Sequence, residues 1–143
     1  MNRKISAGLY FTCLAAILAA IGCVFYLINT KTAYFAGKGV STPVVACLAI
    51  AVICAIVYIV VGLKDTPVWA DILPIATSAL LMAGLMNFAA ARINGIAAIM
   101  TFENNESNMA DLKSAIIGIV LVAIAWIISI IASFMDVSRS VEK

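Results

Sequence analysis

Four long apolar segments constrain the fold of this 143-residue chain more than any other feature. They cover residues 5–28, 43–63, 72–91 and 114–135, and none of them contains an Asp, Glu, Lys or Arg. A helix needs about 20 mostly apolar residues to cross the hydrocarbon layer of a bilayer, and each segment is long enough. We therefore predict four transmembrane helices in a single membrane domain, residues 1–143.

The composition points the same way. Hydrophobic residues make up 65% of the chain and charged residues 11%, whereas soluble domains have about 45–50% and about 25%. A chain this short cannot hide so much apolar surface from water, so lipid must cover much of it. The segments lack the alternation of barrel strands, and open sheets cannot face lipid. The predicted fold is all-α, an integral membrane antiparallel four-helix bundle.

The orientation follows from the basic residues outside the segments. An even number of spans places both termini on one side of the membrane. That side holds five basic residues and the other side holds four, and loops on the cytoplasmic side carry the excess of Lys and Arg. We predict a multi-pass protein of the cell membrane with both termini cytoplasmic. The two sets are Arg3, Lys4, Lys64, Arg139 and Lys143 against Lys31, Lys38, Arg92 and Lys113.

Missing residue types exclude several classes of function. The chain has no histidine, which excludes bis-histidine haem and imidazole-based zinc sites. No carboxylate lies inside the four segments, which argues against a proton-coupled transporter. A Ser–His–Asp set and a glycine-rich phosphate loop are also missing. The net charge of +2 without a basic run argues against nucleic acid as a partner. We expect no catalysis, no cofactor and no metal site.

Small residues recur four apart within the segments, a spacing that lets helix backbones approach closely in lipid. The residues are Ala15 with Ala19, Ala16 with Ala20, Cys47 with Ala51 and Ala55, Ala79 with Ala83, and Ala125 with Ser129 and Ser133. Asn87 is the most polar side chain deep in a segment. We expect it to form a hydrogen bond between helices or, together with Thr77 and Ser78, to line a pore.

The stretch "ARINGIAAIMTFENNESNMADLK", residues 91–113, is the long break in the apolar pattern. We predict that the third helix ends at Ala91, that Arg92 extends into the headgroups, and that residues 92–113 form an outer loop. A third helix that continued to Phe102 would have about 31 residues and measure roughly 46 Å. That length exceeds a hydrocarbon layer of about 30 Å.

The outer loop is nevertheless largely apolar before its acidic part. The segment "GIAAIMTF" can lie flat in the headgroup layer, dock on a partner protein or re-enter the membrane as a pore element. An apolar segment followed by acidic residues is what a docking surface would show. The candidate partner-binding residues are Arg92, Ile96, Ile99, Met100, Phe102, Glu103 and Glu106.

The run "RINGIAAIMTFENN" and the opening "NRKISAGLYF" resemble small four-span membrane proteins of Gram-positive gut bacteria. This resemblance covers most of the chain and implies a bacterial origin, but that group has no established function or site residues. Our leading functional hypothesis is an accessory or scaffold subunit of a larger membrane complex. Its partners would be the lipid bilayer and either another membrane protein or a second copy. The alternative is a protomer of an oligomeric transporter or channel.

Overall fold

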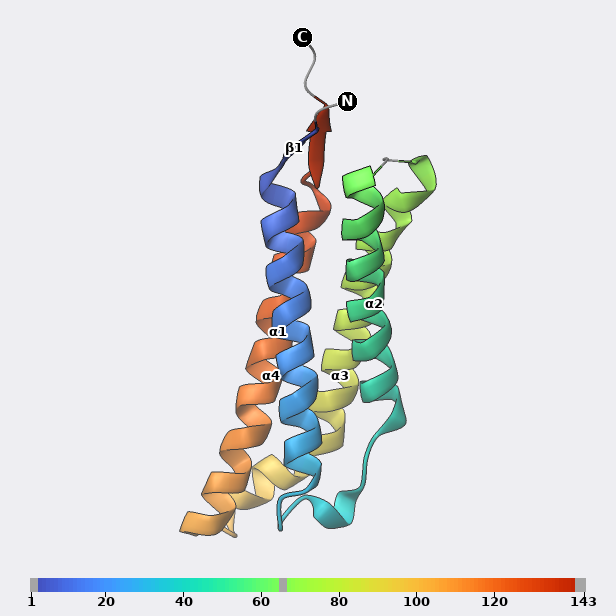
Figure 1. Ribbon diagram of the computed structural model, residues 1–143. Helices are drawn as coiled ribbons and strands as arrows, with labels where there is room; N and C mark the ends of the chain where they lie inside the picture. The colour runs from blue at the N-terminus through green and yellow to red at the C-terminus, as the bar shows by residue number, and fades with distance from the viewer. Residues whose placement is uncertain (1–2, 65–66, 141–143) are drawn as a thin grey trace.

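The computed structural model describes residues 3–64 and 67–140, and its four long helices form an antiparallel bundle (Figure 1). The helices are α1 (Ala7–Thr30), α2 (Thr42–Lys64), α3 (Ile72–Thr101) and α4 (Glu106–Ser133). The helix α1 lies beside α4, and α2 lies beside α3. Each helical stretch is long and apolar enough to cross a membrane. The predicted all-α membrane bundle is therefore confirmed.

Short elements complete the two ends of the bundle. The strands β1 (Arg3–Ile5) and β2 (Ser138–Ser140) pair antiparallel, with Arg3 opposite Ser140. They stand beyond α1 and α4 at what we call the terminal end (Figure 1), where η2 (Val68–Asp71) also lies. The opposite end, which we call the loop end, holds the α1–α2 connection with η1 (Ala36–Lys38) and the α3–α4 connection.

The helices meet along a seam of mostly small residues. In α1 the buried positions are alternately four and three residues apart, an average of about 3.5 that is typical of left-handed helix packing. They are Gly8, Thr12, Ala15, Ala19, Gly22, Tyr26 and Asn29, and Thr30 is buried next to the last of them. Small residues at a helix interface allow close van der Waals contact, which holds membrane helices together where burial from water contributes nothing.

The predicted small-residue positions agree with this seam in three of the four helices. Ala19, Ala51 and Ala125 are buried in the core. In α3 the prediction was wrong, because Ala79 is exposed. The buried face of α3 instead passes through Thr77, Leu81 and Gly84, which lie roughly on the opposite side of the helix from the alanine pair.

Large aliphatic side chains cover the outside of the bundle. They are exposed along the length of every helix, as the examples Ile17, Ile53, Ile56, Ile124 and Ile127 show. Soluble monomers rarely expose apolar surface on this scale. Lipid is the solvent that accommodates it, which supports a multi-pass membrane protein.

The predicted outer loop 92–113 is corrected by the structure. Helix α3 does not end at Ala91 but continues without interruption to Thr101, and α4 begins at Glu106 rather than at residue 114. Only residues 102–105 connect the two helices. The remaining six ends of the four predicted spans differ from the helix ends by two or fewer residues.

Packing beyond the hydrocarbon layer explains why α3 continues. Its last turns slant beneath the end of α1 toward the start of α4 (Figure 1). There Ile99 is buried with Phe35, Leu112 and Ala115 in a second apolar cluster, and Ile96 packs against it. The side chain of Asn105 caps α4 by accepting a hydrogen bond from the Asn108 N–H at 2.8 Å. These protein contacts bury apolar side chains of the last turns of α3, which lie beyond the reach of the lipid chains.

Candidate functional site: a buried arginine and an exposed tip at the loop end

Arg92 is the largest fully buried side chain of the described structure, with 1% of its surface exposed. It does not extend into the headgroups as the sequence predicted. Its guanidinium carbon lies 5.2 Å from the ring centroid of Tyr26 and 5.3 Å from that of Phe35. The quadrupoles of two aromatic faces attract a cation at this distance. Arg92 is thus enclosed between α1 and the α1–α2 connection.

The polar partners of the guanidinium are few. One of its terminal nitrogens donates a hydrogen bond to the Gly39 carbonyl at 3.2 Å. Its Nε has no acceptor among the described residues, and no carboxylate there forms an ion pair with it. Buried charges in proteins are normally paired, because desolvation disfavours an isolated ion. The charge of Arg92 is therefore compensated only in part.

Tyr26 connects the parts of this site. Its hydroxyl accepts a hydrogen bond from the Ser41 N–H at 2.6 Å, which fixes the end of the α1–α2 connection. Its ring meets the Phe88 ring edge-on, with centroids 4.7 Å apart. Gly95 leaves room for Phe35, since a Cβ at Gly95 would lie 2.7 Å from the Phe35 ring. The aromatic walls around Arg92 are therefore held by both packing and hydrogen bonds.

Asn29 is a second buried polar group at the same end. Its amide nitrogen donates to the Ser114 hydroxyl at 3.0 Å and to the Asp111 carbonyl at 3.3 Å, which ties α1 to α4. Its Oδ1 has no donor among the described residues. An unsatisfied buried polar atom is rare in native proteins and calls for an explanation. The loop end thus contains two such atoms, one on Asn29 and one on Arg92.

The carboxylates of the loop end are engaged away from Arg92. The side chain of Asp111 accepts a hydrogen bond from the Tyr34 N–H at 3.0 Å. A hydrogen bond to Glu103 is the main reason that the pKa of the Tyr34 hydroxyl lies above its ordinary value, with partial burial and the charge of Glu103 adding to the shift. Both acids therefore serve to hold the α1–α2 connection against α3 and α4.

The structure separates the predicted partner-binding residues into two groups. Arg92 and Ile99 are buried, and Ile96 is half-buried, so these three pack inside the loop end. Four others are exposed and belong to what we call the tip, which consists of Met100, Phe102, Glu103 and Glu106. Phe102 is 90% exposed and Met100 is 62% exposed. Of the predicted partner-binding residues, these four are the ones whose side chains are exposed.

The structure also separates Asn87 from the other predicted pore residues. Asn87 is exposed on the outside of α3, and its amide donates to the Ala83 carbonyl of its own helix at 2.8 Å. Ser78 faces inward instead, and its hydroxyl shares a hydrogen bond of 3.0 Å with that of Ser129. Thr77 is buried and donates to the Leu73 carbonyl. The three side chains do not form one polar surface.

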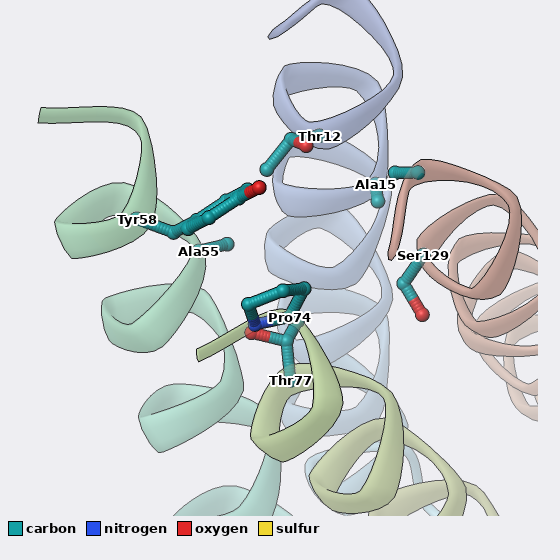
Figure 2. Close-up of a pocket in the computed structure, with 8 residues that line it drawn as sticks. Thr12, Ala15, Ala55, Tyr58, Pro74, Thr77 and Ser129 are labelled. Atoms are coloured by element: carbon teal, nitrogen blue, oxygen red, sulfur yellow. The ribbon is translucent and has the colours of Figure 1, made fainter. Parts of the chain in front are cut away.

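Thr77 lines a crevice among the four helices, toward the terminal end (Figure 2). The space between its walls is about 260 Å³, including the part that opens to the surroundings. Its other lining residues are Thr12, Ala15, Ala55, Tyr58, Pro74, Ser129 and Ala132. Figure 2 shows the Tyr58 ring extending from α2 toward Thr12 on α1. The Thr12 and Ser129 hydroxyls bond to carbonyls of their own helices, so the crevice is largely apolar.

Sequence reasoning missed four residues of the loop end, Tyr26, Asn29, Phe35 and Gly39, and all of them except Asn29 contact Arg92. A signal existed for the first two, because Tyr26 and Asn29 continue the spacing of small residues that begins at Ala15 and Ala19. No local pattern distinguishes Phe35 and Gly39, which reach Arg92 only through the path of the α1–α2 connection.

The described residues contain no group of three or more His, Cys, Asp or Glu side chains that could hold a metal ion. Comparison of the chain with protein-family models, with curated proteins and with solved structures gives no match. The function must therefore be argued from the geometry of the chain itself.

Proposed function

We propose that this small membrane protein is an accessory subunit that binds another membrane protein through its tip. The observation that carries the proposal is the exposure of Phe102 and Met100 at the far end of helices that are longer than the membrane requires. Large apolar side chains exposed beyond the lipid are typical of interaction sites.

The lengths of the helices indicate that the tip stands outside the headgroup layer. Helix α4 has 28 residues, and at 1.5 Å per residue it measures about 42 Å. A hydrocarbon layer of about 30 Å leaves about 12 Å, whereas each headgroup layer is only about 5–7 Å thick. The apolar residues of α4 continue as far as the terminal end of the bundle. The extra length of about 12 Å therefore lies at the other end of α4, at the tip. The headgroup layer would therefore be too thin to cover Phe102.

The composition of the tip indicates what kind of surface a partner would need. Burying an aromatic side chain such as Phe102 contributes about 1.5–3 kcal/mol, which is enough to make it a central contact. Glu106 is exposed beside it, in the first turn of α4. The complementary surface would be an apolar pocket with a basic residue at its rim, on the outward domain of a membrane protein.

The test is purification of the tagged protein at its native level in mild detergent, with mass spectrometry and native mass of the eluate. Phe102→Ser is compared with Phe134→Ser, because Phe134 is 86% exposed at the opposite end of the bundle. We expect a stoichiometric foreign partner that Phe102→Ser loses and Phe134→Ser keeps. A monomer, or a homo-oligomer that is the same in both variants, would refute the proposal.

A second candidate is a protomer of an oligomeric transporter or channel. The crevice around Thr77 and the outward position of Asn87 favour it, since Asn87 could face a path only between copies of the chain. This function predicts a homo-oligomer, and solute flux in liposomes that falls when Asn87 is replaced by Leu.

A further inference from the structure

The groups around Arg92 compensate its buried positive charge only in part. One hydrogen bond, to the Gly39 carbonyl, and two aromatic faces surround it, while Nε lacks an acceptor among the described residues. A cation–π contact offsets only part of the desolvation of a charge. What the site still lacks is an anion with oxygen acceptors, for which the guanidinium has the matching fork of donors.

The position of Arg92 along α3 indicates which anions can reach it. The apolar segment from Ile72 to Ala91 has 20 residues, which at 1.5 Å per residue span about 30 Å, the thickness of the hydrocarbon layer. Arg92 follows directly and so lies at the level of the headgroups at the loop end. The anions concentrated at that level are the phosphates of lipids.

Residues 36–40 of the α1–α2 connection cover Arg92 from outside, and they are exposed. A Cβ added at Gly37 or at Gly39 would meet nothing within 4 Å, so this part of the connection stands clear of the helices. Its two sides are fixed, by the buried Phe35 and by the bond of Ser41 to Tyr26. The cover can therefore lift without disturbing the core.

Lys38, next to Gly39 in the same connection, provides a second cation at this end, and its ammonium nitrogen lies 5.9 Å from the centroid of the Tyr34 ring. Its Cε lies 3.2 Å from the position that a Cβ on Gly95 would take, and Gly95 follows Arg92 by three residues on the buried face of α3. The carboxylates of Glu103 and Asp111 are bonded to Tyr34 instead. Lys38 and Arg92 thus place two cations at this entrance, near the carboxylates of Glu103 and Asp111.

We propose that Arg92 and Lys38 bind the phosphate of an anionic lipid headgroup, which enters beneath residues 36–40. In this exchange the phosphate oxygens replace the Gly39 carbonyl on the guanidinium and also accept from Nε. A phosphate adds ionic attraction and can accept two parallel hydrogen bonds from the guanidinium, which the single Gly39 carbonyl cannot do. The site is separate from the tip and does not depend on the accessory-subunit function.

The experiment measures lipid binding to the purified full-length protein by native mass spectrometry, with phosphatidylglycerol and phosphatidylcholine titrated separately. We expect tighter binding of phosphatidylglycerol, and a loss of about tenfold or more in Arg92→Gln, because a charge-assisted pair is removed. Lys38→Gln should lose only about threefold, as an exposed contact does. Lys113→Gln, which removes an exposed charge at the same end, should leave the affinity unchanged.

A gain-of-binding variant keeps the test decisive if Arg92→Gln does not fold. Gly39 has φ +69° and ψ −174°, a conformation that costs a side-chain-bearing residue energy. Gly39→Ala should therefore move the Gly39 carbonyl away from the Arg92 guanidinium and raise the affinity for phosphatidylglycerol. A misfolded protein would not show such a rise. No rise in Gly39→Ala, or unchanged affinity in a folded Arg92→Gln, would overturn the proposal. Displacement of the lipid by excess inorganic phosphate would overturn the lipid as source and assign the site to a soluble phosphate.

Discussion

Replacement of Gly8 by Ala tests how closely α1 approaches the segment that follows α4. Gly8 is buried in the first turn of α1 and faces the backbone of Met135 and Asp136. An added Cβ would collide with the Asp136 carbonyl oxygen and would lie 2.8 Å from that of Met135. Both obstacles are backbone atoms, so they cannot rotate away.

The expected magnitude is a balance of two opposing effects. Alanine favours a helix over glycine by about 1 kcal/mol. Overpacking of a tight contact costs about 1–3 kcal/mol. Because the atoms that the new Cβ meets are backbone atoms, we place Gly8→Ala at the upper end of this range. We expect a net loss of about 1–2 kcal/mol. At Gly84 the added Cβ meets the Leu48 Cδ2 at 2.8 Å, the far end of a flexible side chain, so Gly84→Ala should change stability by less than about 1 kcal/mol.

The assay is the free energy of unfolding in mixed micelles with increasing dodecyl sulfate, followed by circular dichroism. Gly37→Ala is the matched control, because a Cβ at Gly37 meets open space. The expected order of stability is Gly37→Ala, then Gly84→Ala, then Gly8→Ala. A Gly8→Ala protein as stable as the Gly37→Ala protein would refute the close contact of α1 with the segment that follows α4. Equal losses at Gly8 and Gly84 would refute the distinction between backbone and side-chain obstacles.

Three further predictions concern single contacts. Asn87→Leu should keep or slightly raise stability, by up to about 1 kcal/mol, because the amide faces lipid and bonds only within its own helix; a clear loss in the same assay would contradict this. Asn105→Ala should cost about 1 kcal/mol by removing the cap of α4, measured against Asn104→Ala. The raised pKa of Tyr34 means that its contact with Glu103 stabilises the fold below the unfolded pKa of about 10 and is lost as the pH rises through the folded pKa. Glu103→Gln should lower that pKa, and an NMR titration of the Tyr34 ring that finds no change would contradict the assigned cause.

The number of long helices could be predicted from the sequence, because lipid imposes a minimum length on every apolar span. The uninterrupted apolar runs, such as residues 43–63, reveal that length directly. The same rule failed beyond Ala91, since it treats the edge of the hydrocarbon as the end of a helix. The buried spacing of α3 in fact continues through Phe88, Arg92, Gly95 and Ile99. Periodicity was therefore the better guide to where α3 ends.

The surroundings of Arg92 could not be predicted in the same way. An arginine after an apolar run ordinarily extends toward water, and nothing next to it in the sequence indicates burial. Its burial depends on Tyr26 and Phe35, which precede it by more than 50 residues and arrive through the packing of α1 and its following connection. Tertiary structure, and not local pattern, decides whether this charge meets lipid, water or aromatic rings.

The two proposed surfaces of the loop end can be tested independently because different contacts hold them. The tip is fixed to the rest of the protein through Asn29 and Tyr34, which bond to Asp111 near the start of α4. The cover of Arg92 begins after Phe35 and ends before Ser41, so lifting it leaves both of these bonds intact. Phe102→Ser should then remove a partner without changing lipid affinity, while Gly39→Ala should change lipid affinity without removing the partner. A variant that changed both would mean that the cover and the tip move together, through Tyr34, which contacts both Glu103 and Lys38.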